Sequence, residues 1–432
     1  MKVLVLVLYF FLVPAIGFAA TALDFETVLD AALRHSYDLR SSVLDIGISR
    51  ALLKEARSAY YPTLSTRFNT QCTKDLTGSD IPQVTTVGET VISQNTGYQD
   101  SVSISASLNL YDFGIREHRV LMAKKDIPLK QAVSVQTTRD TKIKVLELYR
   151  DIQVSLSELT SRKQLLQLYK DLVRTEKRLF TAGLLSKIEL SKEAVRLVKT
   201  IDEIDNLNLK IASALQELSF LTGENYDQEG LTLSPIEPKG EGKLFNLTNS
   251  PEYRIYELAL EKKQAEITAL HRETWFPQIG LYTSYIIYGQ DSSSYRESYR
   301  DMSDRSYYVG LVANIPIFDG FKNRAQVEKA RLELQQLQVE KEKKLSELSS
   351  RYEKLREQSR ILGKSFDNQQ EALTLAETAA MMKDRLAEKK IVEEVQRLRK
   401  QIELVTQRCE LARAGILKAA AARELQIMAE GE

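Results

Sequence analysis

The sequence has few of the residues that build metal sites or cofactor-binding motifs. Its 432 residues include only 3 histidines, 2 cysteines and 1 tryptophan. His35, His118 and His271 are scattered along the chain, without an HExxH motif or another metal-ligand spacing. No glycine-rich phosphate loop is present. The histidines are therefore interpreted as surface or packing residues, and the sequence predicts no enzyme, cofactor or bound metal.

Net charge and potential disulfides are also nearly absent. Lysine and arginine together number 60, and aspartate and glutamate 59, so the balance gives no reason to expect nucleic-acid binding. The two cysteines, Cys72 and Cys409, are too few for a disulfide framework. Two free thiols are the favoured interpretation, and a single disulfide between them is the alternative.

Long apolar runs are confined to the beginning of the chain. Lys2, an apolar stretch from Val3 to Val13 and the small residues Ala19-Ala20 predict a secretory signal peptide over residues 1–20. An uncleaved N-terminal anchor is the alternative. After residue 20 no apolar run approaches the roughly 20 residues of a spanning helix. A membrane-crossing role would therefore require a β-barrel.

The rest of the sequence is written as two similar halves. SAYYPTL at 58–64 and ETWFPQI at 273–279 both place an aromatic-Pro step after a helical stretch, at an offset of 215 residues from Pro62 to Pro277. LYDFG at 110–114 and IFDGF at 317–321 follow in the same order at an offset of 207 residues. Recurrence of both order and spacing predicts an internal duplication. The aspartates of the second pair are expected to cap the helices that follow.

Each half contains two strand candidates with one apolar face. Apolar residues alternate with polar ones from Val102 to Leu110, and the same period of two recurs from Tyr307 to Ile317. Less regular strands are expected to begin at the two prolines, Pro62 and Pro277. The polar segments 77–96 and 290–305 are interpreted as loops between the strands. Four strands cannot close a membrane channel alone, because the smallest barrels have about eight, so any barrel must be shared between subunits.

The remaining segments predict long helices with a coiled-coil seam. Apolar residues recur at steps of three and four over 145–173 and 190–218, and again over 345–373 and 391–416. The seam predicted for the second of these segments comprises Leu190, Ala194, Leu197, Ile201, Ile204, Asn208, Ile211, Leu215 and Leu218. A helix from Gly114 to Thr181 would be about 100 Å long. The pattern predicts two long antiparallel helical hairpins whose charged faces are solvated.

Together these features resemble the TolC-like outer membrane factor family. LDFE at 23–26 with AALRHS at 31–36 resembles the family's opening helix, and AGLLS at 182–186 its hairpin tip. LTG at 221–223 resembles the end of its first repeat. The transitions between helix and strand that carry the resemblance contain Pro62, Pro277, Asp112, Gly114, Asp319 and Gly320. The resemblance covers the chain from about residue 21 onward.

The resemblance implies a mainly helical homotrimer of the outer membrane. Three chains would each give four strands to one twelve-stranded transmembrane β-barrel, and the coiled-coil hairpins would form an α-barrel across the periplasm. The implied organisation is a signal peptide at 1–20, a first repeat at 21–224 with its tip near 183, a linker at 225–250, and a second repeat at 251–432 with its tip near 387. The implied function is the passive exit duct of a tripartite efflux or type I secretion system. Its implied partners are a periplasmic adaptor protein, an inner-membrane pump and outer-membrane lipid.

In the family the hairpin tips close the tube and contact the adaptor. The implied adaptor contacts are Gly183, Leu184, Leu185 and Ser186 in the first tip and Leu386, Ala387 and Glu388 in the second, where Ala387 replaces the family's glycine. Glu189 matches Glu393 at an offset of 204 residues, and the resemblance implies a gate ring of three Glu393 carboxylates. Lys389 matches a basic gate-locking position. Gln396 replaces an acid that is common there, so strong cation binding at the ring is not implied.

Two other interpretations stay open at this point. A periplasmic coiled-coil structural or adaptor protein with a small β domain would keep the heptads, but it should not show two strand pairs at matching positions with one apolar face each. The glutamates of the predicted gate could equally be ordinary exposed charges on helices. An enzyme is disfavoured by the absence of a metal or phosphate motif.

Overall fold

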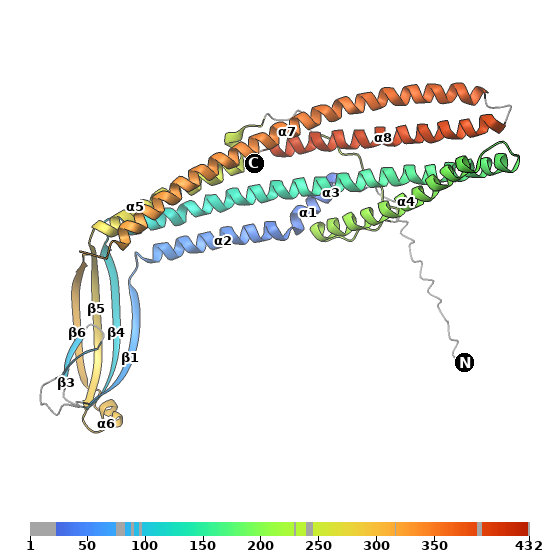
Figure 1. Cartoon of the computed structure of the whole chain (residues 1–432). Helices are drawn as coiled ribbons and strands as arrows, with labels where there is room; N and C mark the ends of the chain where they lie inside the picture. The colour runs from blue at the N-terminus through green and yellow to red at the C-terminus, as the bar shows by residue number, and fades with distance from the viewer. Residues whose placement is uncertain are drawn as a thin grey trace, which may run out of the picture. The chain divides into compact units, whose positions relative to one another are not determined.

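Long helices, a four-stranded sheet and a two-stranded sheet make up the regular structure in the described part of the chain (Figure 1). The computed structural model describes residues 23–74, 83–87, 90–94, 97–228, 230–238, 245–315, 317–386 and 391–430, and of 83–94, 380, 382–386 and 391–393 only the backbone. The helices are α1 (Phe25–His35), α2 (Tyr37–Ser58), α3 (Ile115–Thr181), α4 (Lys187–Thr222), the 3-10 turn η1 (Leu247–Asn249), α5 (Pro251–Trp275), α6 (Tyr295–Arg300), α7 (Lys322–Leu386) and α8 (Ile391–Ala429). The strands are β1 (Thr63–Thr73), β2 (Gln83–Val87), β3 (Thr90–Gln94), β4 (Gly97–Tyr111), β5 (Gln278–Asp291) and β6 (Asp304–Asn314). Within these ranges no helix combines the length and the apolarity needed to cross a bilayer.

The chain divides into two compact units, and each draws on both halves of the duplication. The helical unit contains residues up to 41, 135–250 and 346–432, and the strand unit contains 42–134 and 251–345. The repeats predicted at 21–224 and 251–432 are therefore not the compact units. Helices α3 and α7, of 67 and 65 residues, each contribute to both units. Helices in globular proteins average about 10–14 residues, so these two are several times longer than usual.

The strand unit contains an antiparallel sheet in the order β1-β4-β5-β6. The two central strands come from different halves of the chain, as Figure 1 shows, and β1 and β6 form the edges. One row of the register joins Arg67 to Ser103, Ile286 and Ser306. Side chains alternate between faces, so residues of one row share a face. The predicted division into an apolar and a polar face is confirmed.

The predicted loops between strands contain regular structure. The segment 77–96 includes the β2–β3 hairpin, and 290–305 includes α6. The sequence QVTTVGETVISQ at 83–94 is rich in β-branched residues, which favour strands and were outweighed in the prediction by its polar character. The prediction was also wrong for Ile315 and Ile317, because β6 ends at Asn314. The following Pro316 lacks the amide hydrogen that a ladder requires.

The two strand-to-helix transitions adopt the same left-handed backbone. The φ angle is 56° at Phe113 and 84° at Gly114, and it is 67° at Gly320 and 65° at Phe321. Phenylalanine and glycine exchange places between the halves, yet both positions are left-handed in each. A left-handed backbone costs a residue other than glycine about 1–2 kcal/mol, so its surroundings must hold it. Phe113 stacks on Phe276 with ring centroids 4.9 Å apart, and the shared geometry supports the duplication.

An aspartate caps the helix after each transition, as predicted. Asp112 Oδ2 accepts a hydrogen bond from the backbone N–H of Arg116 at 3.1 Å, and Asp319 Oδ2 accepts one from Asn323 at 2.8 Å. Both donors are the second residue of their helix. Each aspartate lies three residues before the first residue of its helix, because the two left-handed residues come between the aspartate and the helix. Each carboxylate therefore meets free N–H groups and the positive end of the helix dipole.

The helix-to-strand transitions are equivalent as well. Pro62 directly precedes β1 and Pro277 directly precedes β5. Helix α5 ends at Trp275, two residues before its proline, and α2 ends at Ser58. Proline disfavours a helical conformation for the residue before it and cannot donate to a helical hydrogen bond. Both prolines therefore separate a helix from the strand that follows.

The core of the helical unit is built on the predicted seam of α3. Val145, Tyr149 and Ile152 are fully buried in one apolar cluster with residues of α1 and α4. The Tyr149 hydroxyl lies 2.8 Å from the carbonyl oxygens of both Leu23 and Ser234. This contact ties α3 to the segment before α1 and to the segment after α4.

Candidate functional site

The predicted first tip, at 182–186, is the turn between α3 and α4. Gly183 adopts a left-handed φ of 74°, and a Cβ atom there would meet nothing within 4 Å. The Leu184 N–H donates to the Leu179 carbonyl at 2.9 Å and closes the last turn of α3. Glycine is thus required here by the backbone and not by crowding. Leu184 is exposed, whereas Leu185 packs against an apolar cluster at the end of the hairpin.

Glu189, one of the predicted gate residues, forms a capping box with Ser186 at the start of α4. The Ser186 hydroxyl accepts from the Glu189 N–H at 3.2 Å, and Glu189 Oε2 accepts from the Ser186 N–H at 3.1 Å. The Ser186 hydroxyl also donates to Glu189 Oε2 at 2.9 Å. These hydrogen bonds hold the pKa of Glu189 below its usual range. The carboxylate therefore stays ionised and orders the tip in this chain.

The seam of α4 near the tip lies one residue earlier than predicted. The predicted seam there comprises Ala194, Ile201 and Asn208. The buried residues at the same heptad step are Glu193, Thr200 and Leu207. The prediction chose the series with more apolar residues. Nearer the end of α4, the predicted seam residues Ile211, Leu215 and Leu218 are the buried ones. A carboxylate and a hydroxyl consequently occupy core positions of the coiled coil.

The seam of α3 shifts in the same direction. Leu172, Glu176 and Leu179 are buried at steps of four and three, whereas the predicted Val173 is only partly buried. The predicted series would have placed Lys170 in the seam, and an unpaired lysine ammonium is costly to bury. The earlier series places the Glu176 carboxylate there instead. Two buried acids, Glu176 and Glu193, therefore face the interior near the same tip.

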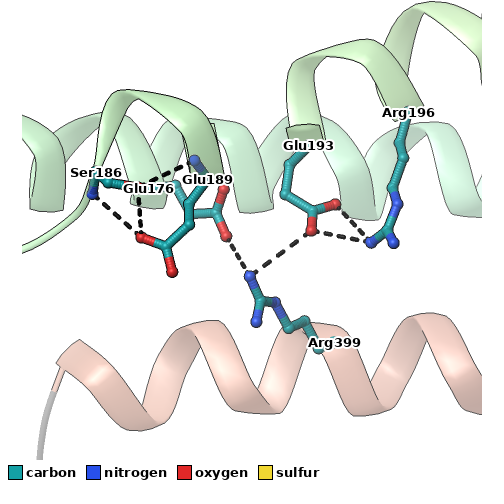
Figure 2. A network of polar contacts seen from close by, with 6 residues as sticks. All are labelled: Glu176, Ser186, Glu189, Glu193, Arg196 and Arg399. Carbon is teal, nitrogen blue, oxygen red and sulfur yellow. Dashed lines mark hydrogen bonds and ion pairs between the residues drawn. The ribbon is translucent and has the colours of Figure 1, made fainter. Parts of the chain in front are cut away.

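Arg399 of α8 neutralises both acids (Figure 2). Its guanidinium Nη2 donates to Glu176 Oε1 at 3.0 Å and lies 3.7 Å from Glu193 Oε1. Arg196 Nη1 donates to both carboxylate oxygens of Glu193, at 2.9 and 3.1 Å. The Glu176 and Glu193 side chains are only 0% and 3% exposed, whereas that of Arg399 is 51% exposed. A half-solvated cation from the second repeat thus compensates two buried anions of the first.

Burial dominates the electrostatics of this cluster. It raises the pKa of Glu176, against the opposing attraction of Arg399 and with the help of the neighbouring Glu193 and Glu189 charges. The second oxygen of Glu176, Oε2, is buried without a hydrogen-bond partner among the described residues. Leu172 and Leu179 of α3 pack against residues of α8 in a small apolar cluster. Burial therefore disfavours the ionised form of Glu176, and the ion pair with Arg399 offsets part of that cost.

The other predicted gate and tip residues are only partly described. Lys389, Ala387 and Glu388 lie outside the described residues, as do the side chains of Leu386 and Glu393. Gln396 is an exposed residue of α8, three positions before Arg399. The roles assigned to these residues, and the gate role of Glu189, stay predictions.

Sequence reasoning missed the cluster of Glu176, Glu193 and Arg399. The heptad series was assigned by preferring apolar residues, so acids at core positions were passed over. A usable signal was present, because Leu165, Leu172 and Leu179 form an uninterrupted step of seven residues. That series places Glu176 at the intervening seam position. The cluster could therefore have been found by following leucines rather than all apolar residues.

The sequence profile of the outer membrane efflux protein family matches residues 28–224 and 246–428. The fold is similar to that of CusC, at 18% identity and a TM-score of 0.73, covering 93% of this chain and 90% of that one. It is also similar to the outer membrane protein VceC from Vibrio cholerae, at 15% identity and a TM-score of 0.69, covering 93% and 96%. The open state of the Neisseria gonorrhoeae MtrE outer membrane channel matches at 18% identity and a TM-score of 0.61, covering 93% and 88%. No curated protein sequence matches the chain at a significant level.

The profile match covers both halves of the duplication, and the fold matches cover nearly the whole chain. The resemblance found in the sequence is confirmed, and the competing adaptor interpretation is wrong. This family consists of trimeric channels and not of enzymes. The chain belongs to the outer membrane efflux protein family and is a TolC-like outer-membrane efflux channel with a periplasmic extension.

Proposed function

We propose that three copies of this chain form the exit duct of a tripartite efflux or type I secretion system, and that Arg399 holds its periplasmic tip closed. Transport through the duct is passive, and an inner-membrane pump supplies the energy. A periplasmic adaptor protein contacts the helical tips and shifts the population from closed to open. The ion-pair cluster of Arg399, Glu176 and Glu193 is the observation that carries the proposal.

The edges of the sheet support assembly through strand pairing. β1 and β6 are each 11 residues long, and within the described sheet each pairs on one side only. Unpaired edges of this length would have no partner for their backbone groups in a membrane. Pairing β6 of one copy with β1 of the next satisfies both edges in three copies. The apolar face, which includes the exposed Leu64, Phe68 and Leu311, then faces lipid.

The first tip supports the adaptor contact. Leu184 and Ile188 are large apolar residues that stand exposed beside the Gly183 turn. The capping box at Ser186 gives this end of α4 a fixed conformation. An ordered turn that presents apolar side chains is a suitable docking point for another helical hairpin. The equivalent residues of the second tip, 386–388, complete the proposed contact.

The closed tip depends on compensation of buried charge. Arg399 lies on α8, and the acids lie on α3 and α4, so the cluster joins the hairpins of the two repeats within the helical unit. Removing one partner of a buried pair costs about 3–5 kcal/mol, because it leaves an uncompensated charge. The half-exposed position of Arg399 reduces that value through solvent screening. Loss of Arg399 should therefore separate α8 from the first hairpin and favour the open tip.

Single-channel conductance in a planar bilayer tests this assignment. Arg399→Gln should raise the conductance of the trimer severalfold at neutral pH. Arg413→Gln is the matched control, because Arg413 also lies on α8, is also 51% exposed and pairs with Glu158 of α3 at 3.4 Å. That acid is less buried than Glu176, so the control should conduct like the wild type. Equal conductance of Arg399→Gln and the wild type would reject the lock but not the channel.

Glu393, Lys389 and Gln396 are proposed to form a second constriction around the pore axis, closer to the tip. Three Glu393 carboxylates would bias the passage of ions, with Lys389 linking neighbouring hairpins. Replacing Glu393 and Lys389 together by alanine should raise conductance independently of Arg399. An unchanged conductance of that double variant would leave Arg399 as the gate residue.

A further inference from the structure

We propose that Arg67 gives the strand end of the duct a preference for anionic solutes, and that the polar groove around it binds their carboxylate or phosphate groups. The inference rests on the proposed closure of three sheets into one pore. It is independent of the gate at the helical tip. The side chains on the polar face of the sheet carry it.

The polar face consists almost entirely of uncharged side chains. Serines occupy alternate positions 101–107 of β4, and Thr63 and Ser65 continue the face on β1. Neighbouring hydroxyls pair across strands, as between Ser105 and Ser284 at 2.8 Å. Among the described positions of this face only Arg67 and Asp304 carry a charge. A water-filled pore lined by hydroxyls leaves these two charges to set the local potential.

Arg67 lies midway along the edge strand β1, opposite Ser103 of β4. It is exposed, and it forms no ion pair within the described part of the chain. Asp304 lies at the loop end of β6, three strands away on the opposite edge. Strands are spaced by about 4.8 Å, so three spacings separate β1 from β6 by roughly 14 Å, and Asp304 is also displaced by two residues along its strand from the row of Arg67. The Arg67 charge is therefore not neutralised within its own sheet.

A groove of about 270 Å³ surrounds Arg67 on this face. Its lining includes Ser65, Ser103, Tyr282 and Tyr308 together with Arg67. An arginine that lines a groove together with hydroxyl groups offers donors suited to a carboxylate or phosphate group. The Tyr282 ring occupies the space above Gly310, where a Cβ atom would lie 2.5 Å from it. Glycine at this position thus leaves room for the tyrosine ring, which lines the groove.

Three copies place three arginines at one level of the pore, and their combined field favours anions. Inorganic tripolyphosphate is added on the side of the bilayer where the strand end of the duct opens. Its block of the current is a sensitive probe of such a ring. Arg67→Gln should raise the half-blocking concentration at least about tenfold at 10 mM salt, where the Debye length is about 30 Å. The difference should vanish at 1 M salt, where the Debye length is about 3 Å.

The controls separate charge from shape. Arg67→Lys keeps the charge, so tripolyphosphate should block this variant nearly as well as the wild type. Arg305→Gln removes an arginine from β6 on the opposite face and should have no effect. If Arg67→Gln does not assemble, Ser103→Glu places a counter-charge opposite the native arginine and should weaken the block in the same way. Equal block in the wild type, Arg67→Gln and Ser103→Glu would overturn the proposal.

A neighbouring copy's Asp304 is the main competitor for Arg67. If the two paired across the subunit boundary, Asp304→Asn would strengthen the block by tripolyphosphate about as much as Arg67→Gln weakens it. The proposal expects a small effect of Asp304→Asn by comparison. A large effect would replace the anion site by an inter-subunit ion pair.

The face that lines the pore is tested separately with a thiol reagent. In a Cys72→Ser background, Ser65→Cys should react with a bulky cationic methanethiosulfonate, and the current should fall. If the reagent leaves the current of Ser65→Cys unchanged, the proposed closure of the sheet is rejected. Reaction at Ser65→Cys with unchanged block in Arg67→Gln would reject the anion site alone.

Discussion

At the scale of single residues, left-handed backbone marks the points where this chain changes structure. Gly183 forms the first tip, Gly223 ends α4, and both strand-to-helix transitions contain a left-handed pair. These positions were largely predictable, because glycine and aspartate signals act locally. The buried acids were not, since a heptad seam is read from apolar residues. Glu176 and Glu193 break that rule at the site where the chain is expected to move.

A series of glycine-to-alanine variants separates backbone strain from crowding. Gly363→Ala in α7 should raise the free energy of unfolding by about 0.5–1 kcal/mol, because it meets nothing within 4 Å. A Cβ atom at Gly320 would also meet nothing within 4 Å, but the backbone there is left-handed. Gly320→Ala should therefore lower the free energy of unfolding by about 1–2 kcal/mol. Gly114→Ala should lower it further, because its Cβ would lie 2.1 Å from the Arg272 guanidinium. Thermal unfolding of the detergent-solubilised trimer measures the order, and a Gly114 variant as stable as the Gly320 variant would contradict it.

At the scale of elements, the helices of the two repeats meet through charge as well as through apolar packing. Leu172 and Leu179 of α3 pack with Val395 and Leu398 of α8 in a small cluster near the tip. This cluster is far smaller than the core around Tyr149. A small apolar contact with buried ions is easier to separate than a large core. The ends of the hairpins are therefore the part of the helical unit best suited to opening.

The pH dependence of the tip follows from Glu176. Its pKa is raised, mainly by burial, so the buried arrangement binds a proton more readily than an exposed one. The closed tip should therefore gain stability as pH falls through the raised pKa, and gain nothing more below the ordinary carboxyl pKa. Conductance should fall on acidification over that window. In Arg399→Gln the opposing attraction is gone, so the same step should move to higher pH.

The control for this titration is Glu176→Gln, which removes the proton-binding group and keeps its size. Its conductance should lose the acid-induced step, although the Glu193 and Glu189 carboxylates remain beside the same cluster. An unchanged step in Glu176→Gln would assign the pH dependence to another group. A rise of wild-type conductance on acidification would contradict the expected sign.

At the scale of the whole molecule, the four-stranded sheet of one chain has two edges, β1 and β6, which we propose are paired with those of its copies. The sequence predicts four strands and their one-sided faces, because alternation is a local pattern. It also predicts the need for sharing, since four strands cannot close. The pairing of β4 with β5, which joins the two halves, is a contact between segments far apart in sequence. No local pattern encodes its register, so it emerges only from the folded sheet.

The two faces of β6 should respond differently to a new charge. Leu311→Arg places a charge on the apolar face, where the side chain is 69% exposed, and should destabilise membrane insertion by about 2–4 kcal/mol near the bilayer midplane. Ser306→Arg places the same charge on the polar face of the same strand and should be tolerated. The fraction of each variant that runs as a trimer on an unheated gel of outer membranes is the measurement. Equal loss of trimer in both variants would contradict the assignment of the faces.

If Arg399 keeps the tip closed by compensating the buried Glu176, the two side chains must be energetically coupled, and a double-mutant cycle measures that coupling. Single-channel conductance is recorded at neutral pH for Arg399→Gln, Glu176→Gln and the double variant. We expect a high conductance for Arg399→Gln and no increase for Glu176→Gln. The double variant should return toward the wild-type value, because the uncompensated acid is then gone. A double variant that conducts as much as Arg399→Gln would contradict the lock.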